Sequence, residues 1–241
     1  MSRGIRYTLI AVVAGVVLFV GGPWVYINLI REDAPESFVD QATATTVATG
    51  DTAAPTTVAA SDTTESSVLS DPSGVWQVSA DSLVGYRVDE VLFGQNVTAV
   101  GRTNAVVGSI EISGSEVIAA KFEVDMTTVT SDEPKRDAQF VSRIMDTLNY
   151  PTSSFVLDSP IALPADATSA LVSHTARGTL TLRGTTKTVE LTVVSSVQNG
   201  RIVVVGEIPV IFSEWGIPNP SIPGITTEDS GVLEFNLVLE R

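Results

Sequence analysis

The stretch at residues 131–137, Ser-Asp-Glu-Pro-Lys-Arg-Asp, could support acid–base chemistry, because five of its seven residues are charged. Carboxylates beside an Arg and a Lys are groups from which enzymes build general acids and bases. The same residues also have a structural interpretation. Ser131 or Asp132 can cap a helix, Pro134 suits its first turn, and the acidic side chains lie near the positive end of the helix dipole.

Apolar residues after this stretch recur at the three-and-four spacing of one helix face. They are Phe140, Val141, Ile144, Met145 and Leu148. The sequence Asn149-Tyr150-Pro151 is expected to end the helix, because the residue before a proline is driven out of the helical region. We therefore interpret the charged stretch as the start of a short helix that lies on the rest of the domain, and not as a catalytic site.

The other residues do not assemble a catalytic site either. The only histidine, His174, falls in a polar connection before a strand, where a surface position is expected. The sequence contains no G-x-S-x-G, H-E-x-x-H, Walker or G-x-G-x-x-G motif. It contains no cysteine, which excludes disulfides and thiol nucleophiles, and its formal net charge of −14 argues against nucleic-acid binding. The residues predict a binding protein that is not an enzyme and has no metal or cofactor.

From Gly74 onward the dominant pattern is the alternation of apolar and polar residues that is typical of strands. The last segment is the clearest, since the leucines and phenylalanine at 233, 235, 237 and 239 alternate with Glu234, Asn236 and Glu240. Gln198-Asn199-Gly200 predicts a hairpin turn. We expect an all-β domain of about eight mostly antiparallel strands with one short helix, forming a closed barrel or a sandwich.

The first part of the chain predicts a membrane anchor. Residues 7–30 form a run of 24 residues without a charge, which is long enough to cross a bilayer. Arg3 and Arg6 precede this run, and Glu32 and Asp33 follow it closely. The positive-inside bias therefore predicts a cytoplasmic N-terminus and an extracytoplasmic domain. A cleaved signal peptide is the alternative interpretation.

The next segment differs sharply in composition. Residues 42–68 are mostly Ala, Thr and Ser, and no Lys or Arg occurs between Arg31 and Arg87. Such a segment has too few apolar side chains to form a core, so we expect a disordered acidic tether. The predicted organisation is an anchor at residues 1–31, a tether at 32–73 and a folded domain at 74–241.

Several motifs of the folded domain, taken in order, resemble the YceI-like family of polyisoprenoid-binding, lipocalin-like barrels. They begin with G-V-W-Q-V-S at 74–79 and S-L-V-G-Y-R-V at 82–88. The most specific match is V-D-M-T-T-V-T-S-D-E-P-K-R-D-A-Q-F at 124–140, followed by a Tyr-Pro-x-x-x-Phe strand entry at 150–155. The hairpin R-G-T-L-T-L-R-G-T-T-K-T-V-E-L at 177–191 completes the resemblance, which covers about residues 74–241.

The resemblance implies an antiparallel barrel whose apolar bore holds a long isoprenoid or similar lipid, with no enzymatic activity. Alternation gives the candidate lining residues, although the same pattern would also suit a filled core. These candidates are Tyr86, Val88, Phe122, Val124, Met126, Phe155, Leu157, Leu180, Leu182, Val210, Phe212, Phe235 and Leu237. Four charged motif positions, namely Arg136, Asp137, Arg183 and Lys187, are expected to fix turns or to meet a lipid head group.

Two departures from the family pattern are visible. Asp89-Glu90 stands where many members have a histidine, and residues 213–231 form a long proline-rich loop. We expect a single-pass membrane protein that binds lipid outside the cytoplasm, with lipid and membrane as its partners and the possibility of a homodimer left open. The alternative is a ligand-free structural or stress-related envelope protein of the same fold.

Overall fold

A computed structural model of the protein describes residue 25 and residues 33–47, 71–164 and 171–241. The predicted membrane anchor at residues 7–30 lies outside the described residues, apart from Val25. None of the helices in the described ranges is both long enough and apolar enough to cross a membrane.

In the described residues, thirteen strands belong to one sheet, and these strands pair in antiparallel fashion. The strands are β1 (Gly74–Val78), β2 (Leu83–Leu92), β3 (Gln95–Thr103), β4 (Val106–Ser113), β5 (Glu116–Asp125), β6 (Thr130–Ser131), β7 (Thr152–Leu157), β8 (Ile161–Ala162), β9 (Val172–Leu182), β10 (Thr185–Gln198), β11 (Arg201–Ile211), β12 (Ile225–Thr227) and β13 (Ser230–Glu240).

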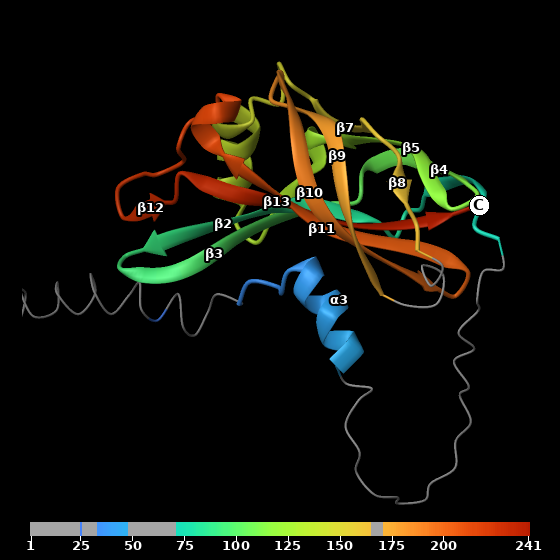
Figure 1. The fold of residues 1–241 in the computed structure, drawn as a ribbon. Coiled ribbons are helices and arrows are strands. Elements are labelled where there is room, and N and C mark those ends of the chain that lie inside the picture. Colours follow the sequence, from blue (N-terminus) through green and yellow to red (C-terminus); the bar gives the residue numbers. More distant parts are fainter. Residues whose placement is uncertain (1–24, 26–32, 48–70, 165–170) are drawn as a thin grey trace, which may run out of the picture.

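Eight of these strands close into a barrel, which confirms the expected fold class. Their order around the barrel is β1, β4, β5, β7, β9, β10, β11 and β13, and the ring closes where β13 pairs with β1 at Gln77↔Glu240 and Val78↔Leu239. The other half of β13 pairs with β2, which carries β3 and β6 beyond it. The barrel is therefore closed at the end that holds the C-terminus and extended by the β2–β3 hairpin at the other end (Figure 1).

A buried serine joins β1 to β2 along the same edge of β13. Ser82 is 0% exposed, and its hydroxyl accepts a hydrogen bond from the Val238 amide at 2.9 Å and donates one to the Val238 carbonyl at 3.2 Å. The Ser79 amide donates to the same carbonyl at 2.8 Å. These bonds satisfy the backbone amide and carbonyl of Val238 where the chain passes from β1 to β2.

The predicted helix is present as α4 (Pro134–Gln139) followed by the π-helical turn η4 (Phe140–Ile144). Its cap is Glu133, whose carboxylate accepts from the Lys135 amide, so the prediction of Ser131 or Asp132 as the cap is wrong. Leu148 was also wrongly assigned to the apolar face, since it is 90% exposed. The helical path ends before it, at Asp146, whose φ is +50°.

A second difference lies within the range predicted to be a disordered tether. Helix α3 (Phe38–Val47) packs on the outside of the barrel against β11 and β13 (Figure 1). Composition alone does not predict this helix, because its stability depends on contacts with strands far away in the sequence. Short 3₁₀ turns, η3 (Met126–Thr128) and η5 (Phe212–Trp215), follow β5 and β11.

Candidate functional site

The barrel encloses an apolar cavity of about 770 Å³. This volume lies within the roughly 300–1,000 Å³ that is usual for small-molecule sites. All thirteen residues predicted to face inward line it: Tyr86 and Val88 from β2; Phe122 and Val124 from β5, with Met126 after it; Phe155 and Leu157 from β7; Leu180 and Leu182 from β9; Val210 from β11, with Phe212 after it; and Phe235 and Leu237 from β13. Their contact with a ligand stays a prediction.

Four aromatic side chains of the bore lie against glycines of neighbouring strands. A Cβ atom added to any of these glycines would fall within 2.2–2.8 Å of a ring atom. The ring–glycine pairs are Tyr86 with Gly101, Phe122 with Gly108, Phe155 with Gly178 and Phe235 with Gly206. Because a glycine leaves room beside the wall, each ring can occupy that space instead of projecting across the bore. The glycines therefore help to keep the cavity open.

The closed end of the barrel is filled by side chains. Trp76 is 1% exposed and Leu239 is 0% exposed, and both pack in one cluster with Ile110, Ile112, Ala120 and Ile202. The indole nitrogen of Trp76 donates to the Pro72 carbonyl at 2.8 Å, so this end contains no unpaired indole donor. The cavity thus has a packed floor at the C-terminal end of the barrel.

The cavity reaches the surface at the opposite end, which we call the mouth. One side of the mouth is apolar: Phe93, at the tip of the β2–β3 hairpin, is 53% exposed, and Ile222 is 39% exposed. The Phe93 amide donates to the Gly224 carbonyl at 2.9 Å, which ties the hairpin to the loop before β12. We call Phe93 and Ile222 the apolar lip.

The other side of the mouth carries charged residues from α4 and β2. Arg136 lines the cavity, forms an ion pair with Asp132 and lies 3.8 Å from the Glu90 carboxylate. Burial alone would lower the pKa of Arg136, but these two carboxylates hold the pKa above its ordinary value. The guanidinium is therefore always charged and is already neutralised by protein carboxylates.

Beside Arg136, Tyr86 stacks on Phe140 with a centroid distance of 5.3 Å and an interplanar angle of 12°. Burial raises the pKa of the Tyr86 phenol, so the phenol stays neutral at physiological pH. The inner part of the mouth is therefore aromatic and uncharged, while the charges stay at its rim.

The other three charged motif positions have structural contacts outside the cavity. The Asp137 carboxylate accepts from the Ser131 amide at 2.9 Å and from its hydroxyl at 2.6 Å. Arg183 donates to the Gly216 carbonyl, and Lys187 pairs with Glu214 at 2.9 Å. These contacts fix the start of α4 and the turn η5, which agrees with a structural role for the charged stretch.

His174 is not at the surface, so that expectation is wrong. It lies within β9, is 9% exposed and lines the cavity, with its Nε2 3.1 Å from the Ser195 hydroxyl. Burial lowers the pKa of its imidazole, and a hydrogen bond with the Ala162 backbone opposes this effect only in part. The strand begins at Val172, two residues before the histidine, so the alternation places His174 inward.

Sequence reasoning also missed the polar and apolar residues that complete the mouth. Glu90 was noted only as a departure from the family pattern, and Phe93 and Ile222 were not noted at all. The alternation of β2 continues from Tyr86 and Val88 to Glu90 and could have placed Glu90 inward.

Across residues 33–47, 71–164 and 171–241, no group of three or more His, Asp or Glu side chains is placed to hold a metal ion.

A protein-family model and two solved structures are similar to this chain. The family model described as the YceI-like domain matches residues 76–239. BcnA from Burkholderia cenocepacia is similar in structure, with 19% identity and a TM-score of 0.53 over 67% of this chain and 98% of that chain. A polyisoprenoid binding domain from Saccharophagus degradans implicated in plant cell wall breakdown is also similar in structure. It has 13% identity and a TM-score of 0.54, over 69% of this chain and 97% of that chain. No curated protein matches the chain.

Proposed function

Because this chain belongs to the YceI-like domain family, we propose that it is a membrane-tethered, extracytoplasmic protein that holds a polyisoprenoid or similar long-chain lipid in its barrel. The observation that carries the proposal is the apolar cavity of about 770 Å³, which has a packed floor and an open mouth. Each CH₂ group moved from water into such a cavity contributes about 0.8 kcal/mol. A long hydrocarbon chain is thus the ligand that this cavity suits best.

The glycine positions support a ligand-binding barrel over a ligand-free one. In a barrel whose bore is only a core, large aromatic side chains would cross the bore and fill it. Here the rings of Phe122, Phe155 and Phe235 lie against glycines of the neighbouring strands, and a cavity of about 770 Å³ lies between opposite walls. An empty apolar cavity of this size lowers stability, because its lining side chains lack packing partners. A bound lipid would supply those partners.

The charged side of the mouth suits a lipid with an uncharged head. Arg136 is the most buried cation at the mouth, but Asp132 and Glu90 already neutralise it. A diphosphate head would have to displace one of these carboxylates or approach both of them. A hydroxyl or carbonyl head could instead accept a hydrogen bond from the guanidinium without such repulsion.

We also propose that the protein is not an enzyme and needs no cofactor. The charged residues that could support acid–base chemistry are occupied with capping α4 and with pairing at the mouth. His174, the single histidine, faces an apolar cavity and contacts the Ser195 hydroxyl. The membrane location is proposed from the uncharged run at residues 7–30 and the charges around it.

The proposal is tested by purifying the full chain from membranes and identifying extracted lipids by mass spectrometry. We expect about one long-chain lipid per barrel. Apo protein should then take up a fluorescent prenol more tightly than the matching prenyl diphosphate, at equal chain length. Absence of a stoichiometric lipid, together with failure of both probes to bind, would contradict lipid binding; preference for the diphosphate would contradict only the uncharged head.

A further inference from the structure

Glu234 is an outward-facing residue that is nevertheless fully buried. It alternates with Leu233 and Phe235, whose side chains pack in the barrel core, so its own side chain lies on the outer wall. The exposed fraction of that side chain is 0%. Its Oε1 accepts from Arg102 Nε at 2.7 Å, and its Oε2 lies 3.8 Å from Arg87 Nη1. A buried carboxylate on an outer wall indicates that something covers it.

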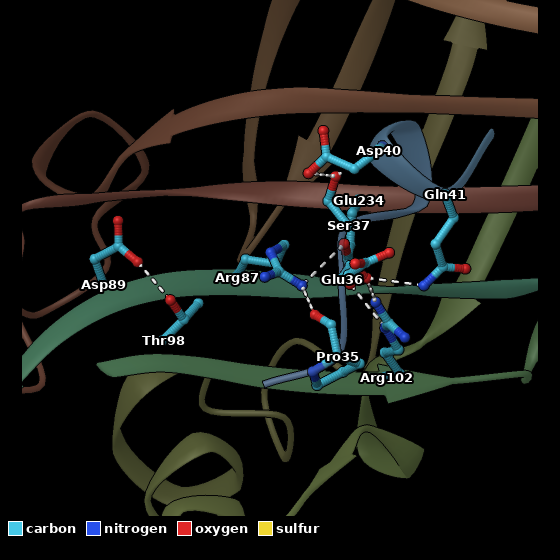
Figure 2. A network of polar contacts seen from close by, with 10 residues as sticks. All are labelled: Pro35, Glu36, Ser37, Asp40, Gln41, Arg87, Asp89, Thr98, Arg102 and Glu234. Atoms are coloured by element: carbon cyan, nitrogen blue, oxygen red, sulfur yellow. Dashed lines mark hydrogen bonds and ion pairs between the residues drawn. The ribbon is translucent and has the colours of Figure 1, made fainter. Parts of the chain in front are cut away.

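The cover is the chain's own segment before α3 (Figure 2). Arg87 donates to the Pro35 carbonyl at 2.6 Å, and Arg102 donates to the Glu36 carbonyl at 3.0 Å. The Phe38 ring lies 4.0 Å from the Arg102 guanidinium, measured to the ring centroid, which is within the range of a cation–π contact. Two arginines held by one carboxylate thus bind two successive backbone carbonyls, and we call this arrangement the clamp.

Helix α3 depends on this docking. It starts at a local cap, where the Ser37 hydroxyl accepts from the Asp40 amide at 3.1 Å. It has ten residues, however, and isolated helices shorter than about 12–15 residues are only marginally stable in water. Phe38 is 3% exposed, and the outward-facing Val205 on β11 is 4% exposed, in agreement with packing of α3 on β11.

The clamp also gives the segment a direction. Arg87 binds Pro35, and Arg102, which is paired with Gly85 in the sheet, binds Glu36. Since β2 runs from Leu83 toward the hairpin tip at Phe93, Arg87 is closer to the tip than Gly85 is. The chain therefore enters the clamp from the side of the mouth, and Figure 1 shows residues 33–37 reaching α3 from the side of the β2–β3 hairpin.

We propose that the clamp holds the barrel with its mouth toward the bilayer, so that the apolar lip of Phe93 and Ile222 contacts the membrane surface. This inference rests on the membrane anchor proposed above. Only residues 31–34 lie between Ile30, the end of the uncharged run, and Pro35. Five Cα steps span at most roughly 18 Å, whereas the 44 steps from Ile30 to Gly74 could span roughly 150 Å. When the segment before α3 is docked, the anchor is therefore joined to the barrel by the short run from Ile30 to Pro35 instead of the long run from Ile30 to Gly74. This short run reaches the barrel on the side where the cavity opens.

The first test uses labels, because the chain has no cysteine of its own. Phe93→Cys places a fluorophore at the lip, and Ser115→Cys places one at the exposed β4–β5 turn, at the opposite end of the barrel. Each full-length variant is reconstituted into phosphatidylcholine nanodiscs that contain brominated lipid. We expect the label at position 93 to be quenched several-fold more than the label at position 115.

The second test releases the clamp from the segment side, so that the barrel itself is unchanged. Phe38→Ala removes the buried ring while placing the best helix former at that position, so any loss of helix reflects lost docking. We expect amide hydrogen exchange in α3 to accelerate on the order of 100-fold, as for loss of a buried phenylalanine, and quenching at position 93 to fall to that at position 115. Ala44→Gln, at an exposed position of the same helix, should change neither.

Four results would overturn the proposal. Two concern quenching: equal quenching at positions 93 and 115, or quenching at position 93 that persists in the Phe38→Ala variant. Two concern hydrogen exchange in the unchanged chain: α3 amides that exchange as fast as in an unfolded chain, or α3 protection that varies with protein concentration and so comes from a second copy. Failure of the chain to co-float with liposomes would contradict the anchor and with it the proposed orientation. Lipid content, measured in the same samples, reports separately on the proposed function.

Discussion

Substitution of Gly206 by alanine tests whether the glycines keep the bore open. A Cβ atom at this position would lie 2.5 Å from the Cζ atom of Phe235, whereas ordinary contacts begin at 3.4 Å. The ring must therefore move by about 0.9 Å, the difference between these distances. The new methyl group has no room to shift away from the ring, because the Thr192 carbonyl oxygen lies 3.1 Å from the same Cβ position. The ring is expected to swing into the cavity.

The expected cost is that of modest overpacking, about 1–3 kcal/mol. For a domain of this size, each kcal/mol lowers the melting temperature by about 2–4 °C, so a decrease of roughly 2–12 °C is expected. Because the displaced ring narrows the bore, the amount of lipid per barrel should also fall. Differential scanning calorimetry and quantitative lipid extraction measure these two effects on the same preparation.

The matched control is the double variant Gly206→Ala/Phe235→Leu, in which the side chain that meets the new methyl group is shorter and flexible. We expect lipid content to recover in the double variant. The reasoning would be refuted if Gly206→Ala kept both its melting temperature and its lipid, or if removal of the Phe235 ring failed to restore lipid. Either result would show that the ring–glycine contact does not control the width of the bore.

Three further predictions concern the wall, the mouth and pH. Leu182→Glu puts an unpaired carboxylate at a site that is 1% exposed, so we expect weakened folding and loss of co-purifying lipid; a folded variant with its full complement of lipid would contradict the inward assignment. Arg136→Ala should lower the melting temperature, because Asp132 and Glu90 lose their cation, while binding of an uncharged prenol persists; a turnover that disappears with unchanged melting would argue for an enzyme. Because burial lowers the pKa of His174, the unfolded chain binds the proton more tightly, and stability should fall as pH drops below about 6.5; His174→Gln should flatten that part of the profile, and an unchanged profile would show that His174 is not its cause.

The lining of the bore could be predicted because alternation in a strand is a local property. Successive side chains of a strand point to opposite faces, so the pattern of β13 alone is enough to place Phe235 and Leu237 inside. The openness of the bore could not be predicted in this way. It depends on which residue faces each ring across the sheet, as Gly206 faces Phe235, and this register follows from pairing between β11 and β13.

The clamp was missed for a related reason. The composition of residues 42–68 correctly indicates that this segment is poor in core-forming side chains. It does not indicate that Phe38, just before the segment, contacts Arg102, which is far away in the sequence. The hydrogen bond from Arg102 to the Glu36 carbonyl joins residues 66 positions apart. In the alternating pattern of β13, Glu234 is indistinguishable from a solvated charge, and only the covering segment makes it a buried one.

Lipid site and clamp occupy opposite faces of the same two strands. Tyr86 lines the cavity, whereas its neighbour Arg87 binds the Pro35 carbonyl. On β13, Phe235 packs in the barrel core, whereas the Glu234 carboxylate contacts Arg102 and Arg87 on the outer wall. Since alternation separates the two sets of side chains, each can change without altering the chemistry of the other. The lipid site and the clamp nevertheless share one backbone, because β2 and β13 are hydrogen-bonded to each other from Val232↔Arg87 to Asn236↔Leu83. The clamp therefore holds, from the outside, the two strands that border the mouth, since β2 ends there and β13 begins there.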